Sequence, residues 1–285
     1  MKNKIPSFLT IGHICKDLKK SSYSIGGTAF FASLTAKKMG LTPFVITKTD
    51  PVIVSKLSFL NIKCINIPTK TPTIFHNQDK KGIRIQYLLQ AATKIPSTIL
   101  PETWKNIPIV LLSPIINEVG FNFFSSFAKN SLIGACLQGW IRKPIKTVIH
   151  YKNLPMDKRI LRATVLFASK EDFKNNEEKF WELQNKILIL TNGPNGCTIK
   201  TENGFTKIPS VKVNHTNTVG AGDVFAASFL IHYFASHNPI EAALFANISA
   251  AKAISAKTIF EMPNLDEITK SFNKNKKTFL DNLKT

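Results

Sequence analysis

Short runs of consecutive apolar residues, separated by longer mixed stretches, dominate the hydrophobic pattern of this chain. They predict β-strands at residues 8–11, 44–46, 63–67, 109–112, 132–137, 164–167 and 187–190. Because the runs do not alternate between apolar and polar residues, both faces of each strand are expected to be buried, as in a parallel sheet whose strands are separated by helices. The pattern predicts a doubly wound α/β fold, with a mainly parallel sheet, helices on both faces and ligands at the carboxyl ends of the strands.

One segment departs from this alternation of strands and helices. Residues 71–75 and 83–89 are rich in β-forming residues, and the polar stretch between them, 77–82, has the composition of an exposed turn. We therefore expect a β-hairpin excursion around residues 68–92. A chain of 285 residues that is 44% hydrophobic can bury one large core, so a single domain over 1–285 is expected.

An apolar stretch at 224–231 follows the sequence Asn-Thr-Val-Gly-Ala-Gly-Asp at 217–223 and predicts a buried helix from about Ala221. Gly220 and Gly222 permit positive φ and the close approach of a ligand. The first turn of a helix also offers unpaired N–H groups and the positive end of the helix dipole. This turn is therefore a candidate anion site.

Asp223, in the same turn, has two interpretations. A carboxylate in the first turn of a helix is favoured by the dipole by about 0.3–1 kcal/mol, which would be a purely structural role. Alternatively, Asp223 is a general base that takes a proton from a hydroxyl while the turn holds the charge developing on a transferred phosphoryl group. The turn alone favours neither interpretation.

The net charge narrows the classes of function. The formal charge of +20 has the sign expected of a nucleic-acid binder. However, the basic residues are mostly lysines scattered along the chain, and bidentate recognition of bases and phosphates needs arginine. Nucleic-acid binding is therefore not predicted, and the hydrophobic content excludes a disordered chain.

The cysteines and the N-terminus predict a reduced, cytoplasmic protein. Cys15, Cys64, Cys136 and Cys197 lie far apart, without the spacing of a zinc site or a disulfide framework. His13 lies close to Cys15, but core packing is expected there rather than metal binding. No signal peptide is evident. The long apolar helix is expected in the core rather than in a membrane, because a carboxylate stands at its start.

Three motifs follow one another along the chain. Gly12 is followed five residues later by Asp17, the pair Gly26 and Gly27 opens a predicted helix, and the turn at 217–223 comes last. In this order they resemble the PfkB, or ribokinase-like, family of carbohydrate kinases, whose signature reads Asp-Thr-x-Gly-Ala-Gly-Asp. The resemblance extends over most of the chain and implies a ribokinase-like fold.

The same resemblance implies a chemistry. Family members transfer the γ-phosphate of ATP, with Mg²⁺, to a hydroxyl of a small sugar or polyol. By this resemblance Asp223 is the general base, and Gly220, Ala221 and Gly222 form the anion hole.

The implied acceptor site combines the N-terminal motifs with the hairpin. Asp17, Gly26 and Gly27 stand where family members bind substrate, and the segment 68–92 stands where they have a small β lid. Members that phosphorylate ribose carry an asparagine at the position of Phe31. An aromatic ring cannot replace an amide that binds hydroxyls, so ribose and adenosine are not the expected acceptors.

Gln138 and Arg142 follow the predicted strand at 132–137. They resemble the inositol kinase branch of the family, which has Gln and Arg four residues apart at this point. This resemblance favours a polyol or cyclitol acceptor over a hexose. The two residues are equally compatible with a structural link between a strand and a helix.

A nucleotide site is implied further along the chain. Thr191, Gly193 and Gly196 resemble the family's Thr-x-Gly-x-x-Gly element, although the same residue types form plain turns between strands. Asn247 corresponds to a residue in the wall of the adenine pocket, or it is a buried amide bonded to the main chain.

Two departures from the family pattern concern the magnesium site. Asn217 replaces the acid that normally begins the signature, so the metal shell would be less acidic. The family's Asn-x-x-Glu element corresponds to residues 169–172, where Asp172 would bind Mg²⁺ through a water molecule.

Other functions remain open. Phe30 or Phe31, in the helix after the glycine pair, is suitable for stacking on a base, as in a nucleoside kinase. Asn217 and the altered 169–172 element are compatible with a non-catalytic regulator that binds a sugar or a nucleotide. The exposed hairpin also permits a homodimer through the lid.

Overall fold

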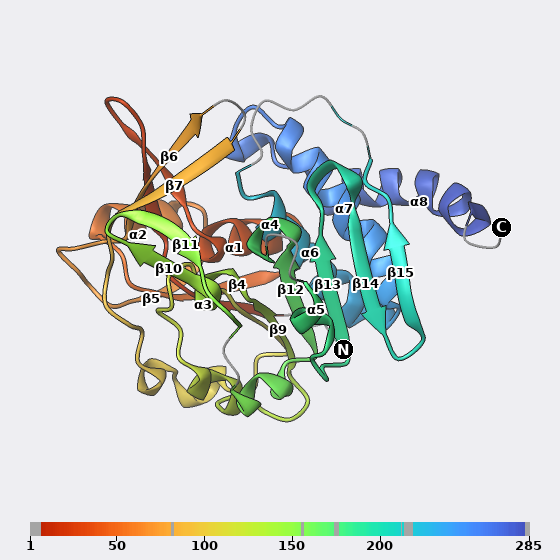
Figure 1. Ribbon diagram of the computed structural model, residues 1–285, viewed down its shortest axis with the longest axis horizontal. Coiled ribbons are helices and arrows are strands. Elements are labelled where there is room, and N and C mark those ends of the chain that lie inside the picture. The colour runs from red at the N-terminus through yellow and green to blue at the C-terminus, as the bar shows by residue number, and fades with distance from the viewer. Residues whose placement is uncertain are drawn as a thin grey trace.

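The computed structural model describes residues 7–80, 83–154, 157–173, 177–211, 213 and 219–282 (Figure 1). Its centre is a nine-stranded sheet in the order β15-β14-β13-β12-β9-β8-β1-β4-β5. The strands are β1 (Ser7–Ile11), β4 (Thr42–Thr47), β5 (Lys63–Asn66), β8 (Ile109–Leu112), β9 (Leu132–Cys136), β12 (Val165–Ser169), β13 (Ile187–Thr191), β14 (Cys197–Thr201) and β15 (Gly204–Ile208). All neighbours from β5 to β13 are parallel, whereas β14 and β15 add an antiparallel edge. The predicted doubly wound fold is confirmed.

Both faces of this sheet are buried, as the strand pattern predicts. In β8, Ile109 and Leu111 belong to one core cluster, and Val110 and Leu112 belong to the other. The first cluster lies under long helices, namely α1 (Thr28–Lys38), α6 (Ala221–Ser236), α7 (Pro239–Ser255) and α8 (Leu265–Asn282). The second lies under short elements, among them η3 (Phe121–Ser125), α3 (Gln138–Ile141), η4 (Lys158–Arg162) and α5 (Glu178–Trp181). The remaining helices and 3₁₀ turns are α2 (Pro51–Phe59), η1 (Ser97–Ile99), η2 (Glu102–Trp104), α4 (Lys170–Phe173), η5 (Gly193–Asn195) and η6 (Ile259–Glu261).

A six-stranded second sheet, called the small sheet below, contains the predicted hairpin. Its order is β10-β11-β7-β6-β2-β3, with β2 (Cys15–Leu18), β3 (Tyr23–Gly26), β6 (Ile74–Lys80), β7 (Ile83–Gln90), β10 (Arg142–Ile145) and β11 (Val148–Tyr151). The hairpin of β6 and β7 is antiparallel, as expected, and β2 joins it in parallel. Cys15, Phe75, Leu88 and Ile149 bury one face of the small sheet against Ile115. The hairpin is therefore part of a larger sheet that draws on distant segments.

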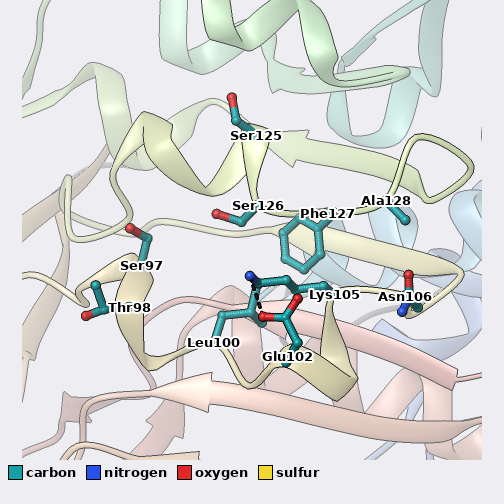
Figure 2. A pocket seen from close by; sticks show the side chains of 10 residues that line it. All are labelled: Ser97, Thr98, Leu100, Glu102, Lys105, Asn106, Ser125, Ser126, Phe127 and Ala128. Atoms are coloured by element: carbon teal, nitrogen blue, oxygen red, sulfur yellow. Dashed lines mark ion pairs between the residues drawn. The ribbon is translucent and has the colours of Figure 1, made fainter.

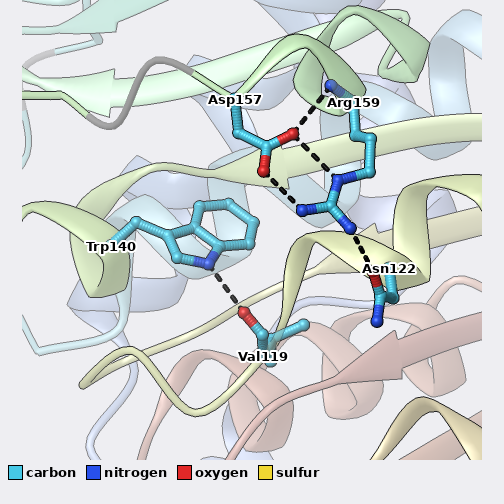
Figure 3. A network of polar contacts seen from close by, with 5 residues as sticks. All are labelled: Val119, Asn122, Trp140, Asp157 and Arg159. Carbon is cyan, nitrogen blue, oxygen red and sulfur yellow. Dashed lines mark hydrogen bonds and ion pairs between the residues drawn. The ribbon is translucent and has the colours of Figure 1, made fainter.

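Trp140 is a buried member of the second core cluster. Its indole Nε1 donates a hydrogen bond to the Val119 carbonyl at 2.7 Å (Figure 3). The centroid of its ring lies 5.2 Å from the ring centroid of Phe121. Beside it, the Arg159 guanidinium joins Asp157 to Asn122. Trp140 is therefore a core residue, in contrast to its neighbours Gln138 and Arg142 in the candidate site.

Helix α6 begins at Ala221, as predicted, and is buried along most of its length. Its partner α7 is capped by the Asn238 side chain, which accepts hydrogen bonds from the main-chain N–H groups of Ile240 and Glu241, both at 3.1 Å. Within the described ranges, none of the helices combines the length and the apolar character that a membrane span requires.

Candidate active site

The turn before α6 holds its two glycines in different conformations. Gly220 has φ 84° and ψ −3°, in the left-handed region, as predicted, and its carbonyl accepts the N–H groups of Asp223 and Val224 at 3.1 and 2.9 Å. The expectation of a positive φ is wrong for Gly222, which lies inside α6. The space beside the Gly222 Cα is nevertheless open to 4 Å, so the main chain of the first turn is accessible to an anion. Asn217 lies outside the described residues.

Asp17 depends on the glycine pair for its position. A Cβ at Gly26 would lie 2.1 Å from Asp17 Oδ2, and a Cβ at Gly27, where φ is 96°, would lie 2.5 Å from the His13 carbonyl. No other residue fits at either position without moving its neighbour. The glycine pair therefore lets β3 approach the carboxylate of Asp17 on β2.

The hairpin contributes a residue that the sequence did not single out. The Asn77 side chain donates to Asp17 Oδ1 at 3.4 Å and accepts from Gln86 at 3.0 Å. Asn77 and Gln86 stand opposite each other in β6 and β7. In the sequence, Asn77 is one polar residue in a segment rich in β-forming residues. Sequence alone does not distinguish such a residue from an ordinary exposed strand residue.

One cavity of about 320 Å³ unites these parts. Asp17 and Asn77 line it from the small sheet, and Gly220 and Ala221 line it from the start of α6. Phe31 also lines the cavity, and its ring lies against the glycine turn, since a Cβ at Gly220 would come within 2.7 Å of it. The structure thus brings together the N-terminal motif, the hairpin and the glycine turn, which lie far apart in the sequence.

The buried thiol of Cys15 is influenced by charged groups of the candidate site. Burial raises its pKa well above the usual range, the charges of Asp17 and Asp223 act in the same direction, and the charge of Arg142 acts against them. The charges of Asp17, Arg142 and Asp223 therefore all act on the Cys15 thiol.

Arg142 and Asp172 form a buried polar group beside this region. Arg142 is 8% exposed, its Nη1 donates to the Ile115 carbonyl at 3.1 Å, and its Nε has no hydrogen-bond partner among the described residues. Burial raises the pKa of Asp172, although the nearby Arg142 charge and hydrogen bonds from Ser169 N–H and Gln138 oppose this shift. The structure therefore brings Gln138, Arg142 and Asp172 together.

Asp172 is the residue predicted to bind magnesium. Among the described residues, no three His, Cys, Asp or Glu side chains lie close enough together to hold a metal ion. His13 is fully buried and both its ring nitrogens have hydrogen-bond partners, Thr73 and Thr93, so the expectation of packing is confirmed. A magnesium ion at Asp172 would therefore depend mainly on donor phosphates and water for its ligands.

The turn predicted for the nucleotide joins β13 to the antiparallel β14. Gly193 has φ 51° with open space around it, whereas a Cβ at Gly196 would lie 2.0 Å from the Ile208 carbonyl. Thr191 Oγ1 donates to the Ala168 carbonyl at 3.2 Å. Gly196 therefore serves packing against β15, and Gly193 is the open position of this turn.

Asn247 bonds to the main chain. It is 5% exposed, and its Nδ2 donates to the carbonyls of Ile208 and Pro209 at 3.3 and 3.2 Å. We expect Asn247→Ala to lower the free energy of unfolding by about 1–3 kcal/mol, because two carbonyls lose a buried donor. Urea unfolding measures this change. Asn275→Ala removes a half-buried amide in α8 and is the control, expected within about 0.5 kcal/mol of wild type. If both changes lower the free energy of unfolding equally, the hydrogen bonds of Asn247 to the two carbonyls do not stabilise the fold.

A second hollow, of about 730 Å³, lies between the segments around η1, η2 and η3 (Figure 2). Ser97, Thr98 and Ser126 line it, together with the ion pair of Glu102 and Lys105 at 2.7 Å. It shares no residue with the cavity at Asp17 and contains none of the predicted site residues.

Comparisons with known proteins agree with the motifs. The sequence profile of the pfkB family carbohydrate kinases matches residues 163–263. The resemblance to the PfkB family of carbohydrate kinases is confirmed. A protein of Pyrococcus horikoshii described as a sugar kinase is 29% identical over 118 residues, which are 40% of this chain and only 38% of that relative. An uncharacterised sugar kinase of Archaeoglobus fulgidus is 29% identical over 207 residues, or 62% of this chain and 83% of the relative.

Solved structures share the PfkB fold at low identity. A pyrophosphate-dependent kinase of the ribokinase family, complexed with a pyrophosphate analogue and myo-inositol, has a TM-score of 0.73 at 19% identity and covers 90% of this chain and 95% of its own. Fructokinase of Xylella fastidiosa with bound ATP has a TM-score of 0.74 at 13% identity and covers 95% and 99%. These likenesses establish the ribokinase-like fold of this chain.

Proposed function

We propose that this protein is an ATP-dependent kinase that phosphorylates a hydroxyl group of a small polyol or sugar. The cavity between the small sheet and α6 carries this proposal, because Asp17 and Asn77 line one side and Gly220 and Ala221 the other. An acceptor held by the carboxylate and the amide lies next to a helix N-terminus, which suits a phosphate group. The small sheet covers this cavity and acts as the lid that excludes water.

In the proposed reaction, Asp223 takes the proton of the acceptor hydroxyl. The hydroxyl oxygen forms a bond to the γ-phosphorus while the bond to the leaving ADP breaks. Main-chain N–H groups of Gly220, Ala221 and Gly222 stabilise the negative charge that develops on the phosphoryl group. Bound magnesium supplies charge neutralisation for the donor phosphates, and Asp172 would hold it through water.

The acceptor is a polyol or cyclitol in this proposal. Asp17 and Asn77 line the cavity from the small sheet with groups that bind hydroxyls. Arg142 does not line the cavity, and its buried Nε has no hydrogen-bond partner among the described residues. A nucleoside kinase is the second candidate, because Phe31 lines the cavity and offers a ring for stacking. Phe30 cannot take that role because it is 1% exposed and packed in the core.

Pyrophosphate is a second candidate donor. The Asn247 amide bonds to two main-chain carbonyls, which leaves fewer of its hydrogens for an adenine ring. Lys19 and Lys257 line the cavity beside the glycine turn, and such charges suit a compact anion. A pyrophosphate-dependent kinase has the same fold.

A screen of donors against acceptors tests the proposal. ATP and pyrophosphate are each combined with cyclitols, linear polyols, hexoses and nucleosides in the presence of magnesium, and the phosphorylated product is measured. Product from a polyol or cyclitol with ATP supports the proposal, and product from nucleosides alone supports the second candidate. Binding of ATP by calorimetry without any product indicates a non-catalytic regulator. A homodimer through the hairpin lid stays a prediction, and the molecular mass in solution tests it.

We expect Asp17→Asn to raise the acceptor KM by about 10- to 100-fold, because a charged hydrogen bond to the acceptor hydroxyls is replaced by a neutral one. The donor KM is expected to stay within about twofold, since Asp17 lies on the acceptor side of the cavity. Steady-state kinetics with each substrate varied separately measures both constants. Glu202→Gln, an exposed carboxylate between β14 and β15, is the control. A rise in the donor KM alone would contradict the assignment of Asp17 to acceptor binding.

A further inference from the structure

The link from the central sheet to the small sheet is fixed on all sides. It leaves β1 at Ile11 and enters β2 at Cys15. Gly12 N–H donates to the Ile46 carbonyl at 3.1 Å, and Ile14 N–H donates to Thr47 Oγ1 at 2.9 Å. A Cβ at Gly12 would lie 2.2 Å from the Ser113 carbonyl. The chain is therefore packed tightly between the ends of β4 and β8 where it crosses to the small sheet.

His13, at the centre of this link, is fully buried and contacts both legs of the hairpin. Its Nε2 lies 3.1 Å from the Thr93 carbonyl, and its Nδ1 lies 2.9 Å from Thr73 Oγ1. A carbonyl only accepts, so Nε2 carries the hydrogen, and in the neutral ring Nδ1 accepts from the Thr73 hydroxyl. Burial lowers the pKa of His13, which favours this neutral ring.

The two threonines mark the base of the hairpin. Thr73 directly precedes β6, and Thr93 follows the end of β7. Thr73 Oγ1 also accepts the N–H of Ala92 at 3.1 Å, and its carbonyl accepts the N–H of Lys16 at 3.0 Å. One imidazole ring therefore ties together the start and the end of the hairpin where β2 also begins.

Glu118 holds this histidine from the other side. It is 1% exposed, and its carboxylate accepts the N–H groups of His13 at 2.8 Å, Ile115 at 2.9 Å and Ile116 at 2.7 Å. The Ile115 carbonyl accepts Nη1 of Arg142. A continuous chain of hydrogen bonds therefore runs from the base of the hairpin, through His13 and Glu118, to the buried guanidinium.

We propose that His13, held by Glu118, is the pivot that sets the position of the small sheet over the acceptor cavity. It is a positioning residue, which acts through Asn77 and Asp17 on the hairpin side and through Ile115 on Arg142. The inference rests on the proposed kinase function. It assigns a role to a histidine that neither the predicted catalysis nor a metal site uses.

Two variants test the pivot. His13→Leu removes both ring contacts, and Thr73→Val removes one of them while keeping the size of the side chain. We expect each to raise the acceptor KM, by about tenfold for His13→Leu, because hydrogen bonds that fix the lid are lost. Hydrolysis of the donor without acceptor is expected to rise several-fold relative to transfer, since a misplaced lid admits water. The donor KM stays within about twofold.

His232→Leu is the matched control, because this partly buried histidine packs between Phe245 and Phe272, far from the hairpin in sequence. It is expected to leave the acceptor KM and the ratio of hydrolysis to transfer unchanged. If His13→Leu and Thr73→Val lower the melting temperature but change neither quantity, His13 is an ordinary core residue and the proposal is overturned.

Amide hydrogen exchange separates failure of the pivot from failure of the kinase assignment. Faster exchange across β6 and β7 in His13→Leu, but not in His232→Leu, supports the pivot even if the wild-type protein phosphorylates no acceptor. Exchange equal to that of wild type in these strands overturns the pivot, whatever the enzyme assay shows.

Discussion

Replacing Asp223 with asparagine is expected to lower kcat by about 10²- to 10⁴-fold, the usual contribution of a general base. The side chain lies in the first turn of α6, three residues beyond the left-handed Gly220, whose carbonyl accepts the Asp223 N–H at 3.1 Å. Asparagine preserves this main-chain geometry and the approximate shape of the side chain. It cannot take a proton from the acceptor hydroxyl, so the chemical step is the step that slows.

Product formation under saturating donor and acceptor measures kcat, and calorimetry measures donor binding. Donor affinity is expected to be unchanged or slightly higher in Asp223→Asn, because a negative charge near the phosphates is removed. Asp266→Asn is the control, since Asp266 is an exposed carboxylate in the first turn of α8, where the helix dipole favours it. Equal activity of the two variants would return Asp223 to the purely structural interpretation.

Replacing Gly220 with alanine is expected to cost stability through two separate effects. The residue has φ 84°, and a left-handed conformation costs a non-glycine residue about 1–2 kcal/mol. Its new Cβ would also lie 2.7 Å from the Phe31 ring, and overpacking of this kind costs about 1–3 kcal/mol. The free energy of unfolding should therefore fall by roughly 2–5 kcal/mol, the sum of the two effects.

Gly40→Ala separates these two contributions. Gly40 has φ 82° and open space where a Cβ would stand, so its replacement costs only the conformational part. In the double variant Gly220→Ala, Phe31→Ala the ring is absent, and the cost of the glycine change should fall to that of Gly40→Ala. Denaturant unfolding of five proteins provides the comparison, namely wild type, Gly40→Ala, Gly220→Ala, Phe31→Ala and the double variant. If Gly220→Ala lowers the free energy of unfolding no more than Gly40→Ala does, the contact with the Phe31 ring adds no cost at Gly220.

The parts of this protein that could be predicted from its sequence are those encoded in contiguous residues. An uninterrupted apolar run such as 109–112 defines a buried strand whatever its neighbours are, and β8 has these bounds. The glycine turn before α6 is likewise local, and Gly220 adopts the expected left-handed conformation. Gly222 differs because the helix begins one residue before it, at Ala221, and nothing in the residue type fixes where the first helical hydrogen bond forms.

The parts that could not be predicted depend on pairing between distant segments. Strands β10 and β11 contain lysine, proline and histidine, without an apolar run. They pair with each other, and β11 pairs with β7, more than fifty residues earlier in the chain. Glu118 is a lone acid in an apolar stretch, and its function depends on the N–H groups of residues 13, 115 and 116 meeting around it. The sequence therefore does not show that these three N–H groups meet at the Glu118 carboxylate.

The small sheet draws on three separate stretches of chain, 15–26, 74–90 and 142–151. Removing the hairpin alone would leave β2 and β11 with unpaired edges, and such edges attract other chains. For the proposed kinase, we therefore expect that exchanging the hairpin alone as a cassette between relatives does not transfer acceptor specificity. Exchange has to include all three stretches together, or proceed by single substitutions on the face that meets the cavity.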